Sequence, residues 1–147
     1  HIPQVAGWNI SNPIKAAQYW VPIVRKQCDI LIAVTHLGLG ADPLLAARVA
    51  GIDAIVGGHS HSFLSTPLMA KNPAGIEVPI VQGGALGVVL GRLDLTFEHE
   101  KTWRLIKAEE KLMPITNALP EDRAVKKLLE KYLKEPAKKS ALNPAIG

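Results

Sequence analysis

Three histidines follow directly after two apolar segments, and imidazole is a common metal ligand in proteins. His36 ends the run DILIAVTH that begins at Asp29, and His59 and His61 follow the run IDAIVGG at 52–58. Neutral imidazole nitrogens bind zinc, iron, manganese and other transition ions. In extended backbone, residues two apart point the same way, so His59 and His61 are expected to share a face. These residue types predict a metal site, provided that the fold brings the two segments together.

A helix signal between the two apolar segments indicates how they meet. We assign Asp42 as the helix cap and Pro43 as the first helical position, followed by an apolar stretch at 44–50 and a stop at Gly51. Strand, helix and strand then form a βαβ unit with parallel strands and a right-handed crossover. Both strands end at one sheet edge, where open α/β folds bind ligands. A single histidine at a strand end is usually structural, whereas three at one edge favour metal binding.

Four short motifs extend beyond the histidines themselves. They are THLG at 35–38, GGHSH at 57–61, VPIVQGG at 78–84 and LGRLDL at 90–95. Together with the helix between the first two, they resemble the calcineurin-like metallophosphoesterases. The resemblance is strongest to the branch that contains bacterial 5′-nucleotidases and related nucleotide hydrolases, and it runs from about Trp8 to the end of the chain.

The resemblance implies an α/β fold that is half of the family's α/β/β/α sandwich, with the βαβ unit carrying the metal ligands. Residues 1–116 would be the carboxyl-terminal half of a catalytic domain, and 117–147 a linker helix toward a nucleotide-recognition domain. The implied cofactors are two divalent or transition metal ions, drawn from Mn, Zn, Fe, Mg and Co. His36 and His59 would bind one ion and His61 the other, each with its second ring nitrogen hydrogen-bonded to a carbonyl or carboxylate.

The family's other motifs are absent from this sequence: an Asp-x-His pair, a Gly-Asp with the bridging carboxylate, and a Gly-Asn-His with the catalytic histidine. The resemblance therefore implies half an active site. The catalytic residues would lie upstream, in an amino-terminal half of the same domain, and this chain alone would be inactive. We also expect half a domain to leave an apolar sheet face uncovered, formed by 78–81 and the two parallel segments, so that the chain binds its other half or self-associates.

The implied reaction is metal-assisted hydrolysis of a phosphate ester, with a nucleotide as the first candidate substrate. One alternative is a hydrolase of the same superfamily that acts on cyclic nucleotides, nucleotide-sugars or sulfur-oxo esters. Another is a non-catalytic metal-binding fragment. Because the family is commonly exported, the resemblance implies a periplasmic or cell-surface location.

Composition limits the other classes of function. The chain has 147 residues, a formal net charge of +4 and one cysteine, Cys28, which cannot form an internal disulfide. It contains no run of eighteen apolar residues, so we predict no membrane span. Many of its lysines, including Lys134, lie on a helix predicted from about Pro120 to Glu135, opposite an apolar stripe. This pattern indicates a solvated face and argues against nucleic-acid binding.

The remaining elements are predicted from caps, periodicity and turn residues. A helix is expected from Pro13, capped by Asn12, to about Gln27, with a kink or break at Pro22. A loop rich in Pro and Gly follows at about 71–75, and 78–81 is predicted to be a third buried strand. Alternating residues predict a hairpin with strands at about 93–97 and 103–107.

Several other polar residues are weaker candidates for the site. Asp29 and Asp53 lie at the amino ends of their strands, about 17–20 Å from the histidine edge at about 3.3 Å per residue, which excludes them as ligands. Gln82 ends the third strand at the histidine edge, where it could contact solvent, substrate or a ligand shell. His99 is expected to be exposed and inert in the hairpin turn.

Overall fold

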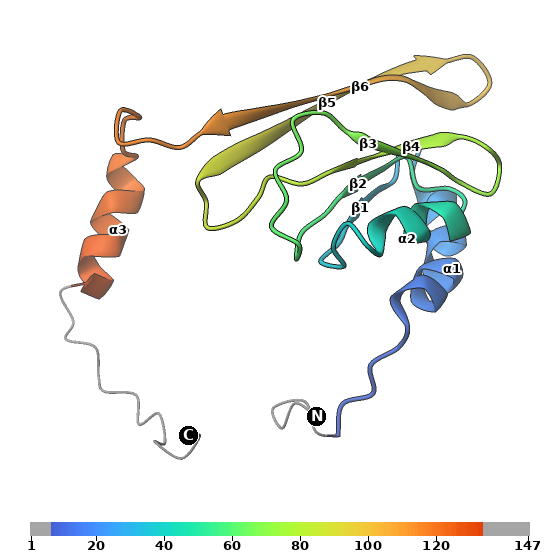
Figure 1. The fold of residues 1–147 in the computed structure, drawn as a ribbon, viewed down its shortest axis with the longest axis horizontal. Helices are drawn as coiled ribbons and strands as arrows, with labels where there is room; N and C mark the ends of the chain where they lie inside the picture. The colour runs from blue at the N-terminus through green and yellow to red at the C-terminus, as the bar shows by residue number, and fades with distance from the viewer. Residues whose placement is uncertain (1–6, 134–147) are drawn as a thin grey trace. The chain divides into compact units, whose positions relative to one another are not determined.

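A four-stranded sheet forms the centre of the computed structural model, which describes residues 7–133 (Figure 1). Its strands lie in the order β1 (Ile32–Val34), β2 (Ala54–Val56), β4 (Glu77–Val81) and β3 (Leu68–Lys71). β1, β2 and β4 run parallel, and β3 is antiparallel to β4. The chain divides into two compact units, His1–Ile115 and Thr116–Gly147, and the sheet belongs to the first.

The predicted βαβ unit is confirmed. Helix α2 (Asp42–Arg48) connects β1 to β2, and the two strands pair in parallel with Ala33 opposite Ile55. Ile55 is in turn opposite Ile80 of β4. The carboxyl ends of these three strands therefore meet at one edge of the sheet, and the segments that carry the histidines begin there.

Helix α1 (Pro13–Val24) begins as the sequence predicts and continues into a 3₁₀ turn, η2 (Arg25–Gln27). The Asn12 side chain caps it by accepting hydrogen bonds from the amides of Ile14 and Lys15, at 3.0 and 3.1 Å. Of the kink or break expected at Pro22, the break is wrong, because the helix is continuous through that residue. Proline removes one backbone donor, and the packing of the apolar side of α1 against the core of the first unit outweighs that loss.

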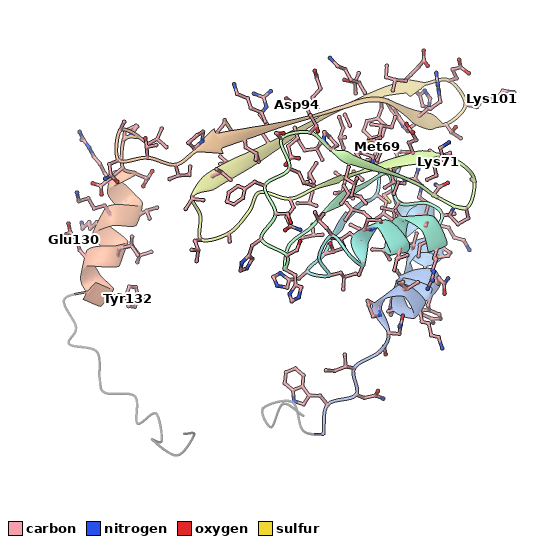
Figure 2. The ribbon with its side chains drawn as sticks, in the orientation of Figure 1. Met69, Lys71, Asp94, Lys101, Glu130 and Tyr132 are labelled. Atoms are coloured by element: carbon pink, nitrogen blue, oxygen red, sulfur yellow. The ribbon has the colours of Figure 1, made fainter. Side chains whose placement is uncertain are left out.

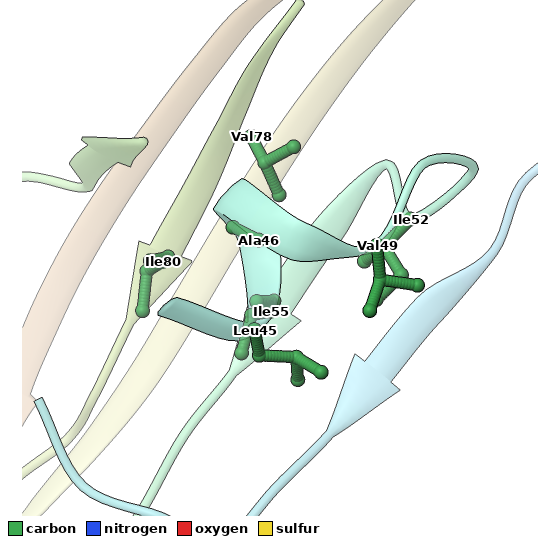
Figure 3. Packing of buried hydrophobic residues seen from close by; sticks show 7 residues of the cluster. All are labelled: Leu45, Ala46, Val49, Ile52, Ile55, Val78 and Ile80. Carbon is green, nitrogen blue, oxygen red and sulfur yellow. The ribbon is translucent and has the colours of Figure 1, made fainter. Parts of the chain in front are cut away.

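The hydrophobic core lies between α2 and the sheet (Figure 3). Leu45 and Ala46 of α2, and Val49 directly after it, pack with side chains of β2 and β4, among which Ile55 and Ile80 are fully buried. Burying one such aliphatic side chain contributes about 1.5–3 kcal/mol to stability. The core thus fixes α2 across the strands whose ends carry the candidate site.

The opposite face of the sheet is apolar and open over β1 and β2. Ile32, Val34 and Val56 are 45%, 83% and 36% exposed, respectively. The expectation that 78–81 would share this exposure is wrong, because all four residues are buried. Val78 and Ile80 belong to the core cluster, and Pro79 and Val81 of the same strand are buried as well.

Two antiparallel hairpins complete the first unit. β3, which the sequence analysis missed, forms a hairpin with β4, and the predicted loop at 71–75 is its turn. Asn72 organises this turn, because its side-chain oxygen accepts from the amides of Ala74 and Ile76 at 2.9 and 3.1 Å. The second hairpin, β5 (Val89–His99) and β6 (Trp103–Pro114), is confirmed and is longer than predicted.

The second unit contains helix α3 (Arg123–Leu133). Asp122 caps it by accepting hydrogen bonds from the amides of Ala124 and Val125, both at 2.9 Å. Figure 2 shows Glu130 and Tyr132 on opposite sides of α3. Lys134 and the end of the predicted helix lie outside the described residues. Within 7–133, no helix has the length and apolar character needed to cross a membrane.

Candidate metal centre

The loops that follow β1 and β2 bring two of the three histidines into contact. The ring centroids of His36 and His59 are 5.2 Å apart, and the ring planes meet at 74°, an edge-to-face arrangement. Both side chains are exposed at the carboxyl edge of the sheet. Two imidazoles from two different loops therefore meet where the βαβ argument places them.

His61 lies on the same loop as His59, but the backbone there is not extended. His59 has φ 79° and His61 has φ 54°, so both residues are in the left-handed region. The extended geometry assumed for the His-x-His motif is therefore wrong. Side chains disfavour this region sterically, and such residues cost about 1–3 kcal/mol each and persist only where the surrounding structure imposes them. Some feature of this loop must offset that strain.

Two glycines before His59 allow other side chains to approach the backbone. A Cβ atom at Gly58 would lie 2.9 Å from Nδ1 of His36, and one at Gly57 would clash with Oδ2 of Asp42. The His36 ring and the Asp42 carboxylate fill the space beside these two glycines.

Asp42 is fully buried and does not cap its helix. The cap position is Ala41, and Asp42 is the first helical residue. Its Oδ1 accepts a hydrogen bond from the Thr35 hydroxyl at 2.7 Å, and its Oδ2 has no partner among the described residues. Burial raises the pKa of Asp42, and the Thr35 hydrogen bond lowers it in part. The expected capping role is therefore wrong, and Asp42 holds the residue next to His36.

Gln82, at the end of β4, is 1% exposed and faces neither solvent nor an open site. Its Oε1 accepts hydrogen bonds from the Ser62 amide at 2.6 Å and the Ser60 hydroxyl at 3.0 Å, and its Nε2 donates to the Gly58 carbonyl at 3.0 Å. Ser60 Oγ also accepts from the Leu39 amide at 3.2 Å, which joins this loop to the one after β1.

The three histidines carry the type of donor atom that transition metal ions bind. Within the described residues, the rings of the three histidines form no hydrogen bond with protein, so their nitrogens are available to a metal. The carbonyl or carboxylate partners expected for the second ring nitrogens are therefore not found in this part of the chain. No group of three or more His, Cys, Asp or Glu residues within 7–133 could hold an ion. The assignment of His36, His59 and His61 as metal ligands stays a prediction. Of these three side chains, the structure brings the rings of His36 and His59 into contact.

Two of the weaker candidates, Asp53 and His99, contact other residues. Asp53 accepts a hydrogen bond from the Leu31 amide at 2.7 Å and forms an ion pair with Arg25. Its carboxylate therefore has its partners at the amino ends of the strands. The ring of His99 lies 4.6 Å from that of Trp103 across the β5–β6 turn.

Sequence reasoning underestimated Asp42 and Gln82. The sequence feature that could have indicated their contacts is the pair of glycines before His59, because a glycine in or beside a strand often marks the close approach of another group.

Comparisons of the sequence and of the structure with known proteins both match this chain to 5′-nucleotidases. The chain is 33% identical over 114 residues to a snake venom 5′-nucleotidase of Macrovipera lebetinus, which covers 69% of this chain and 28% of that protein. It is 31% identical over 115 residues to human 5′-nucleotidase, covering 69% of this chain and 20% of that protein. The solved 5′-nucleotidase precursor of Thermus thermophilus superposes with a TM-score of 0.74 at 33% identity, over 84% of this chain and 27% of that one. No protein-family model matches.

The fold is that of an α/β protein whose paired histidines lie at the carboxyl edge of its sheet. The chain belongs to the 5′-nucleotidase-like metallophosphoesterases. It spans between a fifth and about a quarter of the length of the relatives named above.

Proposed function

We propose that this chain is part of a catalytic domain that hydrolyses phosphate esters with the help of metal ions, with nucleotides as substrates. The observation that carries the proposal is the His36–His59 ring pair at the carboxyl edge of the sheet. Its support is the similarity to proteins named 5′-nucleotidase across about two thirds of the chain. The venom origin of one such relative also supports an exported location, periplasmic or at the cell surface.

In this proposal, His36 and His59 bind one ion and His61 binds a second. When bound, such ions polarise the phosphoryl oxygens and lower the pKa of a coordinated water. The contribution of this chain would be the neutral imidazole nitrogens of the three histidines, held in fixed positions. Asp42 holds Thr35, the residue before His36, and Gln82 contacts the loop that carries His59 and His61.

The carboxylate that bridges the ions and the histidine that protonates the leaving group would come from residues outside this chain. We propose that an amino-terminal half of the same domain supplies them and covers the open face of β1 and β2. Residues 1–116 would then be the carboxyl-terminal half of the catalytic domain, and 117–147 a linker.

The test is hydrolysis of AMP with added Mn²⁺ or Zn²⁺, followed as phosphate release. We expect no significant turnover from this chain alone, and turnover when the upstream half of the domain is co-expressed with it. In that complex, His36→Ala and His59→Ala should each abolish most of the activity, whereas His99→Ala serves as the control. Full activity of the isolated chain, or a fully active His36→Ala variant, would refute the assignment.

A further inference from the structure

The loop that carries His59 and His61 is held in a conformation that it would not adopt unaided. Both histidines have positive φ, and a non-glycine residue keeps such a backbone only where its surroundings impose it. The residues on either side of the two histidines are Gly58, Ser60 and Ser62. Gln82 contacts all three.

We propose that Gln82 is the positioning residue of the candidate metal centre. The inference rests on the proposed function, because it assigns Gln82 to the same metal site. Its amide holds the loop before, between and after the two histidines, so neither residue can relax to negative φ without breaking one of these bonds. Gln82 forms no hydrogen bond with the rings of His36, His59 and His61, and it acts through the backbone that carries His59 and His61.

The chemistry of the side chain suits this role. The loop needs one donor, for the Gly58 carbonyl, and an oxygen that accepts twice, from the Ser60 hydroxyl and the Ser62 amide. A primary amide supplies both. Ionised glutamate would lack the donor, and an apolar side chain would lack both. Gln82 also extends from β4, which is paired on both edges, so its own position is fixed.

The same network reaches the loop of His36. Ser60 Oγ accepts a hydrogen bond from the Leu39 amide while donating to Gln82. Gln82 therefore fixes the His59–His61 loop relative to the loop after β1. This coupling explains how two rings from separate loops keep the edge-to-face arrangement seen for His36 and His59.

The test compares Gln82→Met with Asn72→Leu. Each change replaces a buried amide that organises a loop by an apolar side chain of similar size, but Asn72 serves the β3–β4 turn. Two properties are measured on the chain: the affinity for Zn²⁺ alone, by calorimetry, and hydrogen exchange at the Ser62 amide, whose partner is Gln82. A melting curve for each variant corrects for lost stability.

Partners of metal ligands outside the coordination sphere typically contribute about 10–100-fold in metal affinity. We expect a weakening of that order for Gln82→Met, with exchange at Ser62 at least about 10-fold faster. Asn72→Leu should change both by less than about 3-fold. Gln82→Glu, which retains the acceptors, should give an intermediate affinity, and it replaces the methionine variant if that one does not fold.

Equal loss of zinc affinity in the Gln82→Met and Asn72→Leu variants would mean that Gln82 has only a general structural role. That result would overturn the proposal. Unchanged exchange at Ser62 in Gln82→Met would overturn it as well. If the wild-type chain alone does not bind zinc, the affinity is measured on its complex with the upstream half, and exchange at Ser62 still decides whether Gln82 holds the loop.

Discussion

The His36 ring lies against the backbone of Gly58, so that a Cβ atom at residue 58 would come within 2.9 Å of Nδ1. The glycine is therefore required by the histidine of the neighbouring loop and not by its own φ, since its backbone is not in the left-handed region. This contact joins the two loops of the candidate metal centre, as does the Ser60–Leu39 hydrogen bond.

Substitution Gly58→Ala should displace the His36 ring while leaving the core intact. The contact is with one side chain at the surface, so we expect a stability loss below about 1 kcal/mol and a Zn²⁺ affinity weakened about 10-fold. Calorimetry and urea unfolding measure the two effects. Gly40→Ala is the control, because a Cβ atom at Gly40 would meet nothing within 4 Å. Wild-type zinc affinity in Gly58→Ala would show that the position of His36 is unimportant.

Thr35→Val should destabilise the protein through Asp42. The variant keeps the shape of the side chain but removes the hydroxyl that donates to Oδ1, which leaves a fully buried carboxylate without this partner. An unsatisfied buried polar group costs about 1–3 kcal/mol. Urea unfolding at neutral pH measures the change, with the exposed Thr96→Val as the matched control. A loss no larger than that of the control would mean that water reaches Asp42 in solution.

Much of the fold could be predicted from the sequence because its determinants are local. The Asn12 cap, the apolar runs of β1 and β2, and the alternation in β5 each follow from residue type and spacing. β3 could not be predicted, since its four residues pair only because β4 lies beside them. The meeting of His36 and His59 followed from the topology of the βαβ unit.

The interior of the site could not be predicted, because it depends on contacts between distant segments. Asp42 fits a helix cap by its place in the sequence, but its carboxylate bonds to Thr35 once β1 and α2 pack together. The left-handed backbone at His59 and His61 is likewise imposed from β4 through Gln82. A rule based on neighbouring residues detects neither contact.

Glu110 should make stability depend on pH. Burial raises its pKa from an ordinary value of 4.5 to about 7, and its Oε2 has no partner among the described residues. Between these values the folded state retains a proton that the unfolded state releases, so the free energy of unfolding falls as pH rises from about 4.5 to 7. Above about 7 both states are ionised, and this contribution is constant.

Glu110→Gln removes the group that titrates and keeps its size. We expect the wild-type chain to lose more stability than the variant between about pH 5 and pH 8, as measured by urea unfolding at both values. Comparing the two proteins cancels the contribution of Asp42, whose raised pKa acts in the same direction. Parallel pH profiles for wild type and variant would mean that Glu110 ionises normally in the folded state.

The exposed apolar strip on β1 and β2 should make the isolated chain self-associate. Ile32, Val34 and Val56 lie on neighbouring strands, and Val34 is 83% exposed. Contiguous apolar surface of this kind usually marks a contact with another protein surface. We expect sedimentation to show concentration-dependent oligomers that Val34→Lys shifts toward monomer by placing a charge in the strip. Leu86→Ser is the control, because Leu86 is 95% exposed and lies in the loop between β4 and β5. A monodisperse wild-type monomer that melts cooperatively would show that this face needs no partner, and would remove the main structural support for a covering amino-terminal half.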